Sequence, residues 1–189
     1  MISIFDYMNE KVIAQYLMHS SNETIGYKAQ GLRFIDGEHI LAGLTTQVVN
    51  GYVGKNMCKK LEPRDPSVAQ NRVILLRLDF SVDDIASGKA KHVSSASFSI
   101  IGVHDIGVGS LDGLDYHDGM AMVADQLNDR VLFFKVDPGA ENPLKLVSQQ
   151  RGFIMPHGVA FSRGFKDHVA VTTYGENSVI VQPVPASLK

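Results

Sequence analysis

Three polar residues stand directly before a glycine in three similar phrases of the sequence: Gln30 in "AQGLRF", Asp112 in "LDGLDY" and His157 in "MPHGVAF". An amide, a carboxylate and an imidazole that converge on one point can orient a small polar ligand or bind a divalent metal ion. These residue types therefore predict a ligand-binding site at Gln30, Asp112 and His157, provided that the fold brings the three phrases together.

A second candidate set includes His104, from the segment "GVHDIG" at 102–107. We expect His104 and Asp105 to lie just before an inner strand, on the same side of the fold as His157. With Asp112 and His157, His104 would supply two imidazoles and a carboxylate to a divalent metal ion, the cofactor that this set predicts. The alternative is structural, because histidine and aspartate at strand ends often hydrogen-bond to the backbone.

The phrases that carry these residues belong to a repeat. Residues 113–137 align with 158–184, and each copy begins with a glycine, an apolar residue, any residue and an aromatic residue. Each copy continues with a turn, an apolar strand, a turn containing asparagine and a β-rich run. Residues 31–44 and 71–80 supply a third copy, interrupted by an inserted loop at 45–70. The Asp-Gly and Asn-containing turns favour hairpins, since these residues tolerate positive φ.

Each repeat predicts three antiparallel strands, with a fourth strand expected at 90–98 and at 144–150. The N-terminal segments "ISIFDY" and "KVIAQYL" look like the last two strands of an earlier repeat. In "VLFFKV" and "VILLRL" consecutive residues are apolar, which indicates strands that are buried on both faces. We therefore expect an all-β fold of about three to four β-propeller-type blades, each of four antiparallel strands. A β-sandwich is the alternative, but it does not explain the matched glycine-led starts.

The sequences "PHGVAFSRGFKDHVAVTTYGENSVIV" and "DGLDYHDGMAMVADQLNDRVLFFKVD" resemble repeats of a group of β-propellers. That group includes gluconolactonase and regucalcin, NHL-repeat proteins and YVTN-type lactonase-like proteins, and the resemblance covers residues 25–185. It implies that residues before the leading glycines hold a divalent metal ion, with Asp112 in the place of an aspartate ligand. His157 stands where gluconolactonase-like enzymes have asparagine, and Gln30 also differs from the residues that these enzymes have before the leading glycine.

The expected strands leave a ring of blades incomplete, with two full blades and two partial ones in a single domain, 1–189. Three arrangements stay open. The chain is a fragment of a longer propeller, or several copies associate to complete the ring, or the blades form an open arc. The open arc would leave sheet faces and edges exposed, which favours aggregation.

Composition narrows the classes of partner. The chain of 189 residues is 44% hydrophobic and 20% charged, which is typical of a soluble globular protein. A net charge of -2 at pH 7 predicts no nucleic-acid partner. The sequence has neither an apolar run of about 20 residues nor a signal-peptide pattern, so we expect no membrane span and a cytoplasmic location. The single cysteine, Cys58, excludes a multi-cysteine zinc site.

Two functions follow from the candidate residues. In the first, the protein is a module that binds a small molecule or a protein partner, without catalysis, at the face of the propeller's central channel, which the first strand of each blade borders. In the second, it is a metal-dependent hydrolase of the lactonase type, whose metal polarises a lactone carbonyl and lowers the pKa of a bound water.

Overall fold

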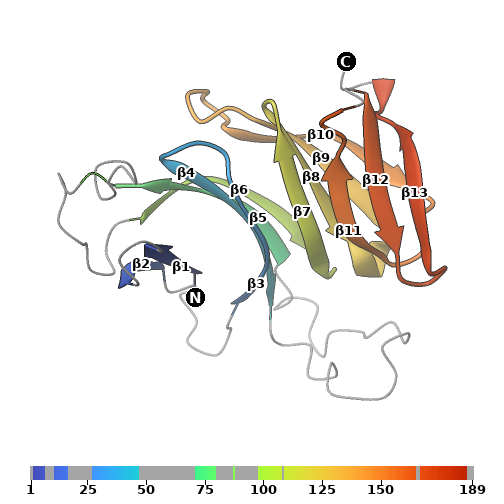
Figure 1. Cartoon of the computed structure of the whole chain (residues 1–189), viewed down its shortest axis with the longest axis horizontal. Helices are drawn as coiled ribbons and strands as arrows, with labels where there is room; N and C mark the ends of the chain where they lie inside the picture. Colours follow the sequence, from blue (N-terminus) through green and yellow to red (C-terminus); the bar gives the residue numbers. More distant parts are fainter. Residues whose placement is uncertain are drawn as a thin grey trace.

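The computed structural model describes residues 2–6, 11–16, 27–46, 71–79, 87, 98–107, 109–164 and 167–186. Within these residues the fold is all-β, as the repeat pattern predicts, and the strands form separate antiparallel sheets (Figure 1). The described part of the chain holds one short 3-10 helix, η1 (Gln126–Asn128), and no helix with the length and apolar character needed to cross a bilayer.

The strands fall into an N-terminal hairpin and three larger sheets. The hairpin consists of β1 (Ile2–Asp6) and β2 (Lys11–Tyr16). Sheet 1 consists of β3 (Tyr27–Phe34), β4 (His39–Thr46), β5 (Asn71–Leu78) and β6 (Phe98–Gly107). Sheet 2 consists of β7 (Leu111–His117), β8 (Met120–Asp125), β9 (Arg130–Val136) and β10 (Leu144–Arg151). Sheet 3 consists of β11 (Pro156–Phe161), β12 (His168–Thr173) and β13 (Ser178–Pro183).

Each sheet coincides with one predicted repeat, and the strands of each sheet follow chain order. The fourth strand of sheet 1 is the exception, because we expected it at 90–98. The structure places this strand, β6, at Phe98–Gly107, where "FSIIGVHDIG" offers β5 a longer apolar partner. Residues 90–97 lie outside the described residues, and so do residues 47–70 of the inserted loop.

Turn residues account for the hairpins. Asp118 and Gly119 connect β7 to β8 with φ of 48° and 77°, and Asn177 has φ of 50° between β12 and β13. In the β3–β4 turn, one carboxylate oxygen of Asp36 accepts hydrogen bonds from the backbone N–H groups of Glu38 and His39. Asp, Asn and Gly are the residues that adopt or stabilise such conformations, so local sequence is enough to place these turns.

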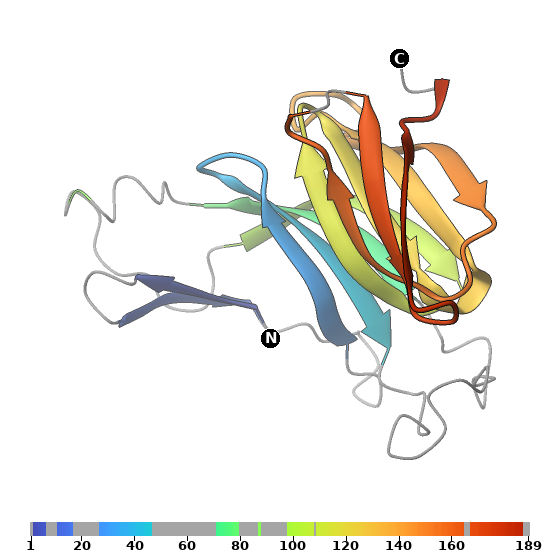
Figure 2. The ribbon, with the colours of Figure 1, turned by 45° about the vertical axis from the view of Figure 1, so that its right-hand side comes forward.

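The three sheets stack face to face, with the first strand of each sheet against the first strand of the next (Figures 1 and 2). The leading glycines permit this close approach. A Cβ added to Gly31 would lie 2.6 Å from the Cβ of Leu114, and a Cβ added to Gly113 would collide with the carbonyl oxygen of His157. The repeated glycine is therefore required where two backbones come together, a role that a residue with a side chain cannot fill.

Sheet 2 forms the centre of the core and is buried on both faces. One face, with Leu132 and Phe134, packs against sheet 1, and the other, with Val131 and Phe133, packs against sheet 3. This confirms the interpretation of "VLFFKV" as a doubly buried strand. The described sheets form an open stack, and the ring that a complete propeller would require is not closed among them.

Candidate functional site

The same irregularity interrupts the first strand of each sheet. The pairing register shifts between Ala29 and Gly31 in β3, between Leu111 and Leu114 in β7, and between Pro156 and Val159 in β11. The residues within these shifts are the predicted ligand residues and two of the leading glycines: Gln30, Asp112, Gly113, His157 and Gly158. A β-bulge turns side chains out of the regular alternation and is common beside functional sites.

Two of the three predicted ligand residues meet directly. His157 Nε2 lies 3.2 Å from Asp112 Oδ2, so an imidazole on β11 reaches a carboxylate on β7. Asp112 is half-buried and His157 is exposed. The pair links sheets 2 and 3 at the start of their first strands and remains open to solvent on the histidine side.

The residue after Gln30, Gly31, lies beside this pair. A Cβ added to Gly31 would be 3.1 Å from the carbonyl oxygen of Asp112. Gln30 is half-buried at that point of β3. The starts of β3, β7 and β11 therefore lie in one row, with the backbone at Gly31 beside Asp112 and Asp112 in contact with His157.

His104 does not join them, and our placement of His104 and Asp105 on the inner side is wrong. Both residues lie in β6, which pairs with β5 at the far edge of sheet 1 from β3. The His104 ring packs edge-on against Phe134 with centroids 5.2 Å apart. Burial lowers the pKa of His104; the negative charge of Asp105 opposes this shift and the positive charge of Arg130 adds to it.

Asp105 is also engaged elsewhere, since its Oδ1 accepts a 2.6 Å hydrogen bond from Arg72 Nε. Among the residues that the structure describes, no three His, Cys, Asp or Glu side chains gather into a set that could hold a metal ion. The predicted metal set of His104, Asp112 and His157 is thus reduced to the Asp112–His157 pair.

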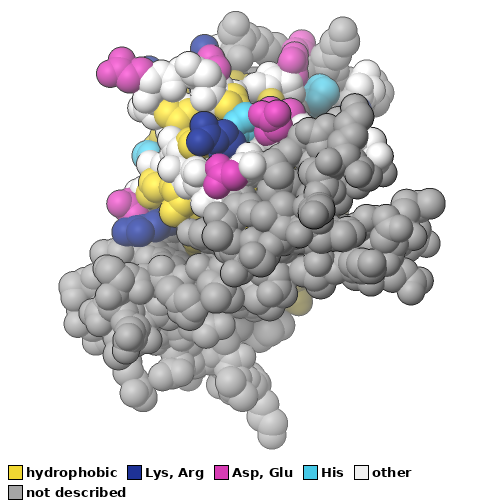
Figure 3. Space-filling model, turned by 90° about the vertical axis from the view of Figure 1, so that its left-hand side faces the viewer, with side chains coloured by type: hydrophobic (Ala, Val, Ile, Leu, Met, Phe, Trp, Pro, Cys, Tyr) yellow, Lys and Arg dark blue, Asp and Glu magenta, His cyan; other side chains and the backbone are white. Residues whose placement is uncertain are grey.

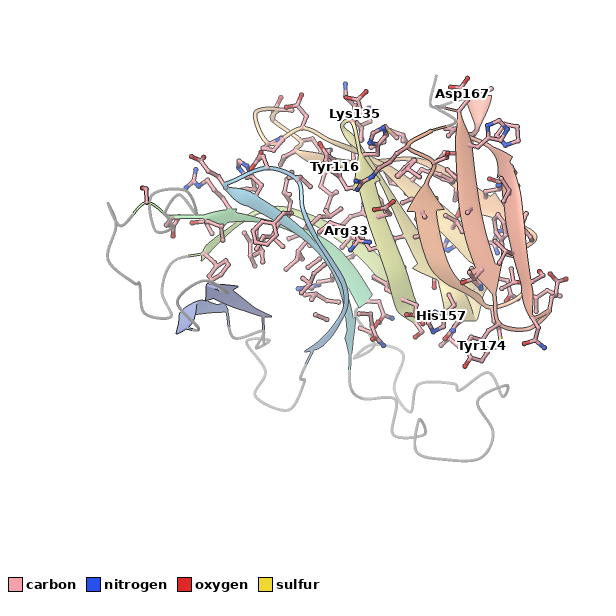
Figure 4. All side chains as sticks on the ribbon, viewed as in Figure 1. Arg33, Tyr116, Lys135, His157, Asp167 and Tyr174 are labelled. Carbon is pink, nitrogen blue, oxygen red and sulfur yellow. The ribbon has the colours of Figure 1, made fainter. Side chains whose placement is uncertain are left out.

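A second polar cluster, which sequence reasoning missed, connects all three sheets. Arg33 Nε donates to Asp115 Oδ1 at 3.0 Å, and the Phe161 backbone N–H donates to Asp115 Oδ2 at 2.9 Å. Asp115 is buried, while Arg33 projects between β3 and β7 (Figure 4). The signal was present in the sequence, because Arg33 and Asp115 are the variable residues two positions after the leading glycines.

An open depression of about 420 Å³ lies beside His157 at the same end of sheet 3. Its lining combines hydroxyl and amide groups with one aromatic ring: His157, Thr172, Thr173, Tyr174, Asn177, Ser178 and Val179. The Tyr174 ring lies against His157 with centroids 5.2 Å apart (Figure 4). Gly158 N–H donates to Thr172 Oγ1 at 2.7 Å, which holds the bulge against the neighbouring strand.

The side chains of this site can both donate hydrogen bonds to a ligand and accept them from it. The Asp112 carboxylate accepts, His157 donates or accepts according to its tautomer, and the hydroxyl groups of the depression do both. Comparison with known proteins adds no assignment, since no family model matches the sequence and a search of curated proteins finds no significant match.

Proposed function

We propose that the three sheets are blades of a β-propeller-type module, and that the module binds a small polar ligand or a protein partner at the start of its first strands. Gln30, Asp112 and His157 are the binding residues. The observation that carries this proposal is the β-bulge that recurs at the same point of β3, β7 and β11 and holds one of these residues each time.

The chemistry of the site supports binding more than hydrolysis. Asp112 and His157 satisfy each other at 3.2 Å, and the described residues add no third metal ligand. A ligand with hydroxyl, amide or carbonyl groups can use the same donors and acceptors, and the Tyr174 ring beside His157 supplies an apolar wall. Pockets that combine an apolar wall with a few polar groups are the usual form of small-molecule sites.

The test is a screen of polar fragments by ligand-detected NMR, followed by titration of the hits. We expect hits on the unaltered protein to weaken about tenfold or more in His157→Ala and Asp112→Ala, because a hydrogen bond to a charged group contributes about 1.5–3 kcal/mol. His117→Ala is the matched control, since His117 is exposed at the opposite end of β7. Hits that bind all variants equally would place the site elsewhere.

Metal analysis of the same samples separates the hydrolase alternative. A stoichiometric divalent metal that co-purifies with the unaltered protein and is lost in Asp112→Ala would favour the metal-dependent hydrolase. Fragment binding that is unchanged by a chelator favours the metal-free site proposed above.

A further inference from the structure

Sheet 3 lies at one end of the stack of sheets (Figure 2) and has one buried face and one exposed face. Val169, Val171 and Ile180 pack toward sheet 2. Side chains alternate between the two faces of a strand, so the residues next to these three point away from sheet 2. We call the side that they form the outer face of sheet 3.

The middle of the outer face is uncharged and open to solvent. Ala160, Ala170 and Val181 are cross-strand neighbours on β11, β12 and β13, and Thr172 and Val179 belong to the next row. Val179 and Val181 are 63% and 66% exposed. None of these five residues carries a charge. Exposed apolar surface that spans several strands is typical of an interaction site.

The outer face combines a ridge and a hollow. A hollow of about 560 Å³ is lined by Ala160 and Ala170 among others, and Val181 stands at its β13 side. The alanines leave room above β11 and β12 because their side chains are short. The two valines of β13 project beside this room, so one edge of the face is raised and the rest is recessed.

The corresponding side of sheet 2 is covered within the chain. The first residue of β9 pairs with the last residue of β8, and the first residue of β13 pairs with the last residue of β12. Val179 and Val181 therefore occupy the positions of Val131 and Phe133. Val131 and Phe133 are fully buried against sheet 3. In this repeat, a sheet is thus what covers that side of the third strand.

The other described sheets offer no comparable free face. Sheet 2 is buried on both faces, and sheet 1 packs on sheet 2 through Val73 and Leu75. The residues on the other side of the two central strands of sheet 1 are no more than 4% exposed, and they are Ile40, Ala42, Leu44, Ile74 and Leu76. The end of the molecule away from sheet 3 shows acidic and basic side chains among the hydrophobic ones (Figure 3). Among the described sheets, the outer face of sheet 3 is therefore the one uncharged sheet face that a second copy can present.

We propose that the outer face of sheet 3 packs on the same face of a second copy of this chain, which gives a dimer with twofold symmetry. A twofold axis that runs along β12 within the interface places β13 of each copy over β11 of the other. Val181 of each copy then enters the hollow above Ala160 of the partner subunit, and the two Ala170 residues face each other. The contact removes apolar surface from water on both copies and brings none of the charged residues of the sheets into its centre.

The size of the face sets the strength of the contact. Sheet 3 has three strands of six residues each. At the usual spacings this is about 15 Å by 20 Å, so the contact lies at the small end of specific interfaces and the dimer should dissociate on dilution. Growth should stop at two copies, because a twofold contact uses the outer face of each copy.

The test measures mass in solution by sedimentation and light scattering, up to the highest soluble concentration. The mass of the unaltered protein is expected to rise from one chain to two. Ala160→Glu and Val181→Glu should each stay monomeric, because each variant places a charge inside an apolar contact. The matched controls are Ala140→Glu, in the turn between β9 and β10, and Ile154→Glu, before β11. Both residues are exposed and lie off the outer face, so both controls should dimerise like the unaltered protein.

Several results would overturn the proposal. The unaltered protein could remain monomeric at every concentration, or its mass could grow beyond two chains. A dimer that is lost in Val181→Glu but kept in Ala160→Glu would indicate pairing at the edge of β13 instead, because Ala160 lies two strands away from that edge. A dimer that is kept in both variants would place the contact on another surface.

Two further observations keep the test clean. Ala160 and Val181 are exposed within one copy, so circular dichroism should show that both variants keep the β-sheet spectrum. Neither residue lines the depression beside His157, so the dimer and the proposed ligand site can each fail without the other.

Discussion

Replacing Asp115 with alanine tests whether the buried carboxylate holds the three sheets together. Asp115 on β7 accepts a hydrogen bond from Arg33 on β3 and another from the backbone N–H of Phe161 on β11. Asp115→Ala removes both acceptors at once. The variant leaves a partly buried backbone donor without its partner, and such groups are costly to leave unpaired.

The expected loss is dominated by the backbone donor. An unsatisfied buried N–H costs about 1–3 kcal/mol, whereas the ion pair with Arg33 contributes about 1 kcal/mol or less because the arginine side chain is 51% exposed. Asp115→Ala should therefore lower the free energy of unfolding by about 1–4 kcal/mol. Arg33→Ala should lower it by no more than about 1 kcal/mol.

Urea denaturation measured by circular dichroism gives these differences if the transition is two-state. The matched control is Asp105→Ala, which removes a shorter ion pair, 2.6 Å to Arg72, from a carboxylate that is 63% exposed. We expect that control to cost less than about 1 kcal/mol. Equal losses in Asp115→Ala and Asp105→Ala would refute the reasoning, because burial and the backbone bond would then make no difference.

Two further predictions concern the packing of the sheets. Gly113→Ala should destabilise the protein by about 1–3 kcal/mol in the same urea assay, because the added methyl group collides with the His157 carbonyl oxygen. Gly164→Ala is the control and should be nearly neutral, because a Cβ at Gly164 would meet no other atom. Equal losses in the two variants would contradict the role of Gly113 in the close approach of the sheets. The pKa of His104 is lowered in the folded state, so as pH falls the unfolded chain binds a proton at this residue before the folded protein does. The contribution of His104 to the free energy of unfolding should therefore be lost as pH falls below about 6.5. His104→Phe keeps a ring against Phe134, and the free energy of unfolding of this variant should vary less with pH over that range; an unchanged pH dependence would show that His104 does not contribute.

The strands and turns were predictable from sequence because their causes are local. Asp118-Gly119 adopts the positive φ values that such a pair favours, and the apolar run after Arg130 is buried on both faces, as the pattern indicates. The same local logic aligned Gln30, Asp112 and His157 in sequence, because each precedes the leading glycine of its repeat. Two of these glycines, Gly31 and Gly113, adjoin the first strand of the next sheet.

The error over His104 has a different origin. The segment "GVHDIG" forms a strand, but its place in the sheet depends on pairing with β5, about 30 residues earlier in the chain. No local pattern distinguishes an edge strand that precedes the next repeat from an inner strand, so sequence alone placed His104 on the wrong side.

The sequence by itself determined the repeat, the positions of most strands, the turns, and the row of glycines with a polar residue before each. Only the tertiary structure decided which side chains meet. Arg33 and Asp115 are separated by 82 residues, and Asp115 and Phe161 by 46, yet all three join in one cluster. The physical reason is that strand propensity and turn chemistry act over a few residues, whereas the contacts between sheets depend on which faces can be buried together.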